Sequence, residues 1–327
     1  MSRILRLTII YVSLICEPSL SGENDETPWS YATDSPEADA SEILLPVASL
    51  ILPGFGQWWR GQYVSGSIYS GVAIGGIKYA KNAESDFGAT KIKSGDLATK
   101  NVAIRKYLLA NQTYQVSGGL SLYHTFRSSV WQRQKFGAYG FLGKGDSPTD
   151  ILIAPFQFKY LARSSTFIPL GVVAAFAWYS ALHPQQGFYN SGFSKEDPWF
   201  AAGFSYNAGT HEEAIFRGWG MPLFHEAGLS NTWSNLAQAS LFAAAHLGSN
   251  RFPLPQFLLG IHLGNVTQNN SWTLSESIFI HVWWDVVVFL SSYHVERNAA
   301  KNTMETGASG DFHKPPSLSL PPISLHF

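Results

Sequence analysis

The chain has 327 residues, which is long enough for two ordinary domains, and a formal net charge of −1. Only 14% of its residues are charged, against roughly 25% in an average soluble protein. It also contains 11 Trp and 22 Phe. This composition indicates helices in contact with lipid. The near-neutral net charge argues against a nucleic-acid-binding protein, because such proteins carry clustered positive charge.

The N-terminus has the pattern of a secretory signal peptide. Two arginines precede an apolar run at residues 7–15, and a small-x-small triplet stands at residues 19–21. Residues 1–21 are therefore predicted to be a signal peptide, with a first membrane anchor as the alternative. Residues 22–42 contain seven acidic residues and no Lys or Arg. This segment is predicted to be a disordered acidic tail.

Residues 43–131 are predicted to form an N-terminal membrane hairpin region. Two apolar stretches, 43–59 and 63–79, each come near the roughly 20 residues that cross a bilayer as a helix. The run LPGFGQ at residues 52–57 resembles the Leu-Pro-Gly-x-Gly-Gln (LPGxGQ) signature of small membrane-hairpin domains. That resemblance assigns no chemistry to the region. A third stretch, 107–131, is amphipathic, and it predicts either a polar membrane helix or a surface helix.

The second half of the chain is more uniformly apolar. Residues 132–164 have the composition of a basic, Gly-rich linker, and residues 165–295 predict a nearly continuous series of apolar helices. The expected fold class is all-α, a polytopic transmembrane helical bundle with about 6 to 8 membrane helices. Residues 296–327 are charged and then rich in Pro and Ser, which predicts a disordered tail.

Three charged residues interrupt the apolar stretch at 199–224. A charge near the centre of a bilayer costs at least roughly 2.5 to 3.5 kcal/mol, so such residues are usually paired and functional. Glu213 and Arg217 are four residues apart and are expected to form an ion pair along one helix face. Glu212 points about 100° away from that face. A carboxylate in such a place is suited to take a proton from water. The alternative is that all three charges form a packing network between helices.

Two further clusters lie on later apolar stretches. His246 follows Phe242 by four residues in a segment of small side chains, which lets helices approach closely. His281 and Asp285 are also four residues apart and therefore share one helix face. The alternatives are a core histidine with satisfied hydrogen bonds, and a His–Asp hydrogen bond that only neutralises two polar groups.

Taken together, the clusters resemble the three motifs EExxxR, FxxxH and HxxxN/D of the CAAX-protease and bacteriocin-processing (CPBP) family of intramembrane proteases. The best-known members of that family are type II CAAX prenyl endopeptidases. The resemblance covers roughly residues 165–295. The matching residues are Glu212, Glu213 and Arg217, then Phe242 and His246, then His281 and Asp285.

The resemblance implies a role for each position. Glu212 would be the general base that activates water, and His246 would help to hold and polarise that water. Glu213 and Arg217 would fix the helix and orient the base.

His281 and Asp285 would lie where the oxyanion of the tetrahedral intermediate forms. The family usually has Asn at the position of Asp285. An ionised Asp cannot donate a hydrogen bond to an oxyanion. Here Asp285 must therefore be protonated or must act by orienting His281.

The expected function is that of an intramembrane endopeptidase that hydrolyses peptide bonds of membrane-associated proteins or peptides with a glutamate-activated water. No metal or cofactor is expected, and the expected partners are the lipid bilayer and the substrate, in a bacterial inner membrane. One alternative is a zinc-dependent metalloprotease that uses His246, His281 and Glu212 or Glu213, although the chain has no HExxH helix. The other is a non-catalytic membrane scaffold or immunity-type protein.

Overall fold

The computed structural model describes residues 40–89, 97–182, 197–247 and 253–306. All regular secondary structure in these residues is helical, which confirms the all-α fold class. The predicted signal peptide at 1–21, most of the predicted acidic tail, and the end of the predicted C-terminal tail lie outside the described residues.

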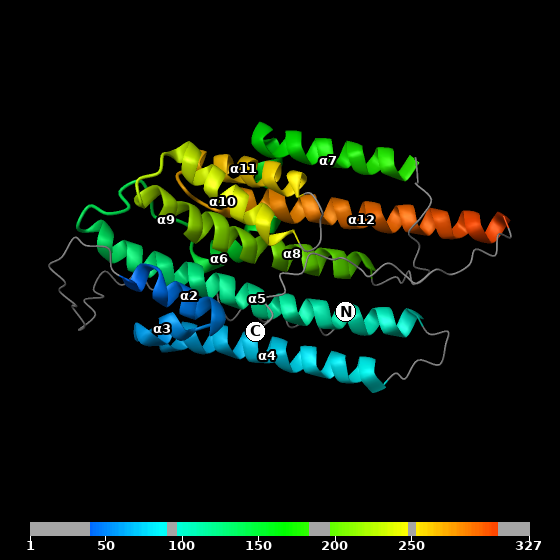
Figure 1. Cartoon of the computed structure of the whole chain (residues 1–327), viewed down its shortest axis with the longest axis horizontal. Helices are drawn as coiled ribbons and strands as arrows, with labels where there is room; N and C mark the ends of the chain where they lie inside the picture. Colours follow the sequence, from blue (N-terminus) through cyan, green and yellow to red (C-terminus); the bar gives the residue numbers. More distant parts are fainter. Residues whose placement is uncertain (1–39, 90–96, 183–196, 248–252, 307–327) are drawn as a thin grey trace.

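The N-terminal part forms one side of the molecule (Figure 1). The predicted apolar stretch at 43–59 folds as two short helices, because Pro53 and Gly54 divide it and Gly54 adopts a left-handed φ of 97°. The long helix at residues 63–89 then packs along the long helix at residues 97–134. The elements are η1 (Ala40–Glu42), α2 (Leu44–Ile51), α3 (Phe55–Trp59), α4 (Tyr63–Ala89) and α5 (Leu97–Gln134).

The segment predicted as a linker packs against the rest of the protein. Ser147 and Asp150 form a capping box that starts a short helix, and the apolar side chains Ile151 and Leu152 behind this cap are buried in the core. Two 3₁₀ turns then lead to the next long helix. These elements are α6 (Pro148–Ile153), η2 (Ala154–Phe156), η3 (Phe158–Ala162) and α7 (Ser164–Leu182).

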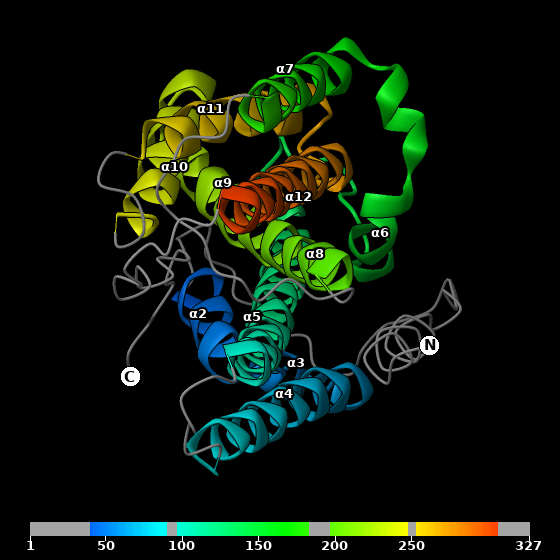
Figure 2. The same ribbon diagram turned by 90° about the vertical axis from the view of Figure 1, so that its right-hand side faces the viewer.

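The remaining helices carry the charged motifs. They are α8 (Asp197–Ile215), the π-helical turn η4 (Phe216–Gly220), α9 (Met221–Glu226), α10 (Asn231–Ala245), α11 (Leu254–Asn269) and α12 (Ser275–Thr306). In end view, α8 lies between α5 and α12, and α7 lies on the outer side of α12 (Figure 2). α10 and α11 pack against each other beside this stack. The motif helices thus meet around α8.

Helical structure is present at the inner ends of both segments that the sequence predicts to be tails. α12 continues to Thr306, beyond residue 295. Glu42, at the end of the predicted acidic tail, is buried, where its carboxylate accepts a hydrogen bond from the Tyr139 hydroxyl at 2.8 Å and pairs with Arg133 at 2.9 Å.

The sequence predicts about 6 to 8 membrane helices. Among the residues that the structure describes, no helix combines the length and the apolarity needed to cross a bilayer.

Candidate active site

Glu212 and Glu213 lie in the last turn of α8, and Arg217 lies in the π-helical turn that follows directly. Such single π turns inside helices are frequent at functional sites. The turn passes close to its neighbours at Gly218, where an added Cβ atom would meet the Tyr123 ring at 2.6 Å and Leu274 at 2.9 Å. A small residue is therefore required there for the Glu212–Arg217 segment to reach its place.

Arg217 is wholly buried and is held by three helices. Its Nη1 donates to Glu213 Oε1 at 2.8 Å, which confirms the predicted ion pair. Its Nη2 donates to the Gly260 carbonyl of α11 at 3.2 Å, and its Cζ lies 4.5 Å from the centre of the Phe242 ring of α10. A charge-assisted hydrogen bond and a cation–π contact thus compensate the buried guanidinium.

Two polar residues of α10 that the sequence analysis missed brace the same region. Gln238 Nε2 donates to the Gly260 carbonyl at 2.9 Å, and Asn235 Nδ2 donates to the Ile261 carbonyl at 2.9 Å. Both side chains are buried. A signal for them exists in the sequence, because Gln238 lies four residues before Phe242 and therefore shares its helix face.

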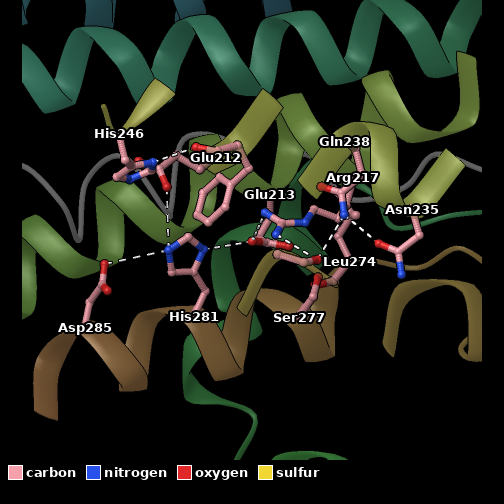
Figure 3. A network of polar contacts seen from close by, with 12 residues as sticks. Glu212, Glu213, Arg217, Asn235, Gln238, His246, Leu274, Ser277, His281 and Asp285 are labelled. Carbon is pink, nitrogen blue, oxygen red and sulfur yellow. Dashed lines mark hydrogen bonds and ion pairs between the residues drawn. The ribbon is translucent and has the colours of Figure 1, made fainter. Parts of the chain in front are cut away.

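His281 links the two glutamates (Figure 3). Its Nδ1 lies 2.8 Å from Glu213 Oε1, the oxygen that also binds Arg217. Because a carboxylate only accepts hydrogen bonds, Nδ1 carries the proton. The Nε2 atom of His281 then faces Glu212 Oε2 at 3.6 Å and Asp285 Oδ2 at 3.8 Å. Glu213 thus fixes the orientation of the imidazole that Glu212 contacts.

His246 ends α10, and its Nδ1 donates to the Phe242 carbonyl at 2.7 Å. This hydrogen bond fixes the orientation of the His246 ring. The Phe242 ring contacts both the His246 ring, at a centroid distance of 4.7 Å, and the His281 ring, at 5.7 Å. In Figure 3 the Glu212 carboxylate lies between the two imidazoles. Phe242 therefore sets the spacing of the two histidines.

The three carboxyl side chains of the site differ in their exposure to solvent. The Asp285 side chain is 26% exposed, whereas the Glu212 side chain is 7% exposed and the Glu213 side chain is fully buried. The structure therefore brings Glu212, His246, His281 and Asp285 together from α8, α10 and α12, with Asp285 at the rim. Glu213, Arg217 and Phe242 lie behind them.

A separate hollow of about 520 Å³ lies between α7 and α11. Glu276 lines it, and its carboxylate accepts hydrogen bonds from Ser165, Arg163 and Asn270. His262 also lines it, and its Nε2 donates to the Ser165 carbonyl at 2.8 Å. None of the motif residues lines this hollow.

Within the described ranges, no three or more His, Cys, Asp and Glu side chains are grouped in a way that suits a metal ion. A buried carboxylate beside two imidazoles can accept and donate protons.

A comparison with known protein families finds a match over part of the chain. Residues 194–287 match the family model described as Rce1-like, type II CAAX prenyl endopeptidase Rce1-like. The matched residues contain every motif residue from Glu212 to Asp285, so the resemblance seen in the sequence is confirmed over this part of the chain. A search of curated proteins and a search of solved structures find no match.

Proposed function

We propose that this protein is an intramembrane endopeptidase that cuts peptide bonds of membrane-associated proteins or peptides with a water molecule activated by Glu212. One observation carries the assignment. Of the two adjacent glutamates, Glu213 is engaged by Arg217 and His281, each at 2.8 Å, whereas Glu212 faces His281 Nε2 at 3.6 Å. Glu212 is thus the carboxylate left to take a proton.

The first half of the reaction follows from this arrangement. The attacking water binds beside Glu212 and His246, and Glu212 accepts one of its protons as the water oxygen attacks the carbonyl carbon of the substrate. The carbonyl π electrons move onto oxygen and form a tetrahedral oxyanion. The Phe242 carbonyl holds the His246 ring in place through Nδ1.

The oxyanion is stabilised by donors on α12. In this proposal His281 carries a second proton on Nε2, the nitrogen that lies 3.6 Å from Glu212 Oε2 and 3.8 Å from Asp285 Oδ2. That N–H is placed to donate to the oxyanion. Asp285 lies at the rim and either donates in its protonated form or orients His281. When the intermediate collapses, the C–N bond breaks and the proton on Glu212 passes to the leaving amine.

We also propose that the protein acts within a lipid bilayer, namely a bacterial inner membrane. Besides the low content of charged residues, the large apolar side chains exposed on α7 support it. Phe176 and Trp178 are each 70% exposed, and Phe167 is 65% exposed. Exposed apolar side chains gathered on one helix are typical of contact with lipid or another apolar partner.

The test is a peptidase assay on the full chain purified from membranes in detergent. A quenched fluorescent peptide with a prenylated CAAX end is compared with the same peptide without the prenyl group. In parallel, the membrane and secreted proteomes of cells that make wild type or Glu212→Gln are compared for peptides that end at new positions. Cleavage that requires Glu212 in either experiment supports the proposal.

Two controls separate the alternatives. Activity that survives exhaustive chelation, with no metal found in the purified protein, argues against the zinc mechanism, because a zinc protease loses its rate with its metal. If neither the peptide assay nor the proteomes show any dependence on Glu212, the protein is a scaffold and not a peptidase.

A further inference from the structure

The LPGFGQ segment lies on the opposite side of α5 from the catalytic helix. In end view α2 and α3 contact one side of α5, and α8 packs on the other (Figure 2). The family match begins at residue 194 and therefore includes neither α5 nor this segment. The LPGFGQ segment contacts α5 through buried side chains and close glycine backbone.

Gln57 anchors the segment on α5. This side chain is wholly buried, and its Nε2 donates to the Ser121 carbonyl and to Thr125 Oγ1, each at 3.0 Å. Its Oε1 accepts from Ser121 Oγ at 2.7 Å. The Gly54 N–H donates to the same Ser121 Oγ at 2.8 Å. Both ends of the Gln57 amide are thus satisfied by one turn of α5.

The two glycines of the motif permit this approach. At Gly54 the left-handed φ of 97° turns the chain toward α5. At Gly56 an added Cβ would lie 2.4 Å from Thr125 and 2.4 Å from Ser49 Oγ. The Gly56 N–H instead donates to Ser49 Oγ at 2.8 Å, and Ser49 is hydrogen-bonded to Thr125 at 3.0 Å. The LPGFGQ segment and α5 therefore form one polar, closely packed interface.

Consecutive glycines of α5 carry the contact through to the catalytic helix. An added Cβ at Gly118 would lie 2.6 Å from the Leu50 carbonyl oxygen of α2. At Gly119 it would lie 2.8 Å from the His211 Cβ and 3.0 Å from the His211 Cα of α8. His211 directly precedes Glu212, so the backbone of α5 sets the position of the helix turn that holds the base.

On its other side, α8 packs equally closely against α12. An added Cβ at Gly209 would lie 2.7 Å from Val282 Cγ2 and 3.1 Å from the Val282 nitrogen of α12. Val282 adjoins His281. α8 is therefore clamped between α5 at His211 and α12 at Gly209, and displacing it on the α5 side changes the 3.6 Å separation of Glu212 and His281.

We infer that the LPGFGQ segment and α5 are a positioning part of the active site, which seats Glu212 against His281 through the Gly119–His211 contact. The inference rests on the proposed function for its effect on rate, but its structural step is independent of substrate. Gly119 and Gln57 are positioning residues, and neither touches the reacting atoms.

The experiment compares two glycine-to-alanine variants of the full chain in detergent. Gly119→Ala adds a methyl group against His211, whereas Gly71→Ala is the matched control, because an added Cβ at Gly71 of α4 has no atom within 4 Å. We expect Gly119→Ala to speed amide hydrogen exchange in α8 while leaving α11 unchanged. On a cleaved substrate, kcat should fall by about 10²-fold with little change in KM, since a displacement near 1 Å at a reacting group has that effect.

A second variant guards against a misfolded Gly119→Ala protein. Ser121→Ala removes the hydroxyl between Gln57 and Gly54 and adds no volume. It should show the same faster exchange in α8 and the same direction of change in kcat, to a smaller extent. Exchange in α8 equal to that of Gly71→Ala in both variants, at comparable thermal stability, would overturn the inference. A wild type that cleaves nothing would refute the proposed function, and the exchange measurement would still decide the positioning role.

Discussion

Replacing Glu213 with an amide tests how the buried site is stabilised. Glu213 Oε1 accepts from Arg217 Nη1 and His281 Nδ1, each at 2.8 Å, and the side chains of Glu213 and Arg217 are fully buried. Glu213→Gln keeps the shape but removes the carboxylate that is hydrogen-bonded to the Arg217 guanidinium. Removing one partner of a buried pair costs about 3 to 5 kcal/mol. Loss of an ordinary hydrogen bond costs only about 1 kcal/mol, so the charge effect dominates.

The assay is thermal unfolding of the purified variants in detergent, followed by far-UV circular dichroism. At about 2 to 4 °C for each kcal/mol, the midpoint should fall by about 6 to 20 °C. The neighbouring Glu212→Gln is the matched control. That variant removes a carboxylate 3.6 Å from His281 and leaves the Arg217 pair intact, so its midpoint should stay close to that of wild type.

A double variant identifies the cause of the loss. Combining Glu213→Gln with Arg217→Met removes the stranded charge and keeps an unbranched side chain of similar length. Its midpoint should lie above that of Glu213→Gln alone, because the penalty comes from the unpaired guanidinium. If Glu213→Gln unfolds at the same temperature as Glu212→Gln, or if the double variant is the least stable of the three, this explanation of the buried pair is wrong.

Three further predictions concern single side chains. Asp285→Asn is expected to retain or raise the peptidase rate, because an amide donates to an oxyanion without first gaining a proton; a large loss of kcat would show that the carboxyl group is needed. His246→Ala should lower kcat by about 10² to 10⁴, whereas the control His262→Ala, whose ring faces α7, should keep a rate close to wild type. Asp146→Ala removes the acceptor for the N–H and hydroxyl donors at the start of α12. It should cost about 1 to 2 kcal/mol, seen as a lower thermal midpoint, and an unchanged midpoint would show that this cap is dispensable.

Helix periodicity accounts for the parts of the site that the sequence predicts well. Glu213 and Arg217 pair because they are one turn apart, and His281 and Asp285 share a face for the same reason. That Glu212 points away from the Arg217 pair also follows from the 100° step of the helix. These inferences need only the local geometry of one helix.

Contacts between helices were not predictable in the same way. The bond from His281 to Glu213 joins residues 68 positions apart, so it depends on how α8 and α12 cross. Gln238 was missed because a polar side chain in an apolar helix gives no sign of its partner, here the Gly260 carbonyl. The sequence predicts a simple role for Glu213 as a partner of Arg217, and the structure adds the orientation of His281.

The N-terminal half shows a similar limit. The LPGFGQ run indicates a kinked hairpin, and the turn at Gly54 agrees with that prediction. The polar face of α5 that receives Gln57 lies 64 residues further along the chain, and no local pattern connects the two. Likewise, residues 148–153 are too short and mixed to stand out from a linker, yet Ile151 and Leu152 are core residues because a capping box starts a helix there.

The most direct test of the central claim is the turnover of Glu212→Gln on a substrate that wild type cleaves. The amide keeps the volume of the side chain but cannot take a proton from water, so kcat should fall by about 10² to 10⁴. The thermal midpoint and the helical circular dichroism of the same sample should match those of wild type, which excludes misfolding as the cause. Wild-type turnover by Glu212→Gln would contradict the proposal that this glutamate activates the water.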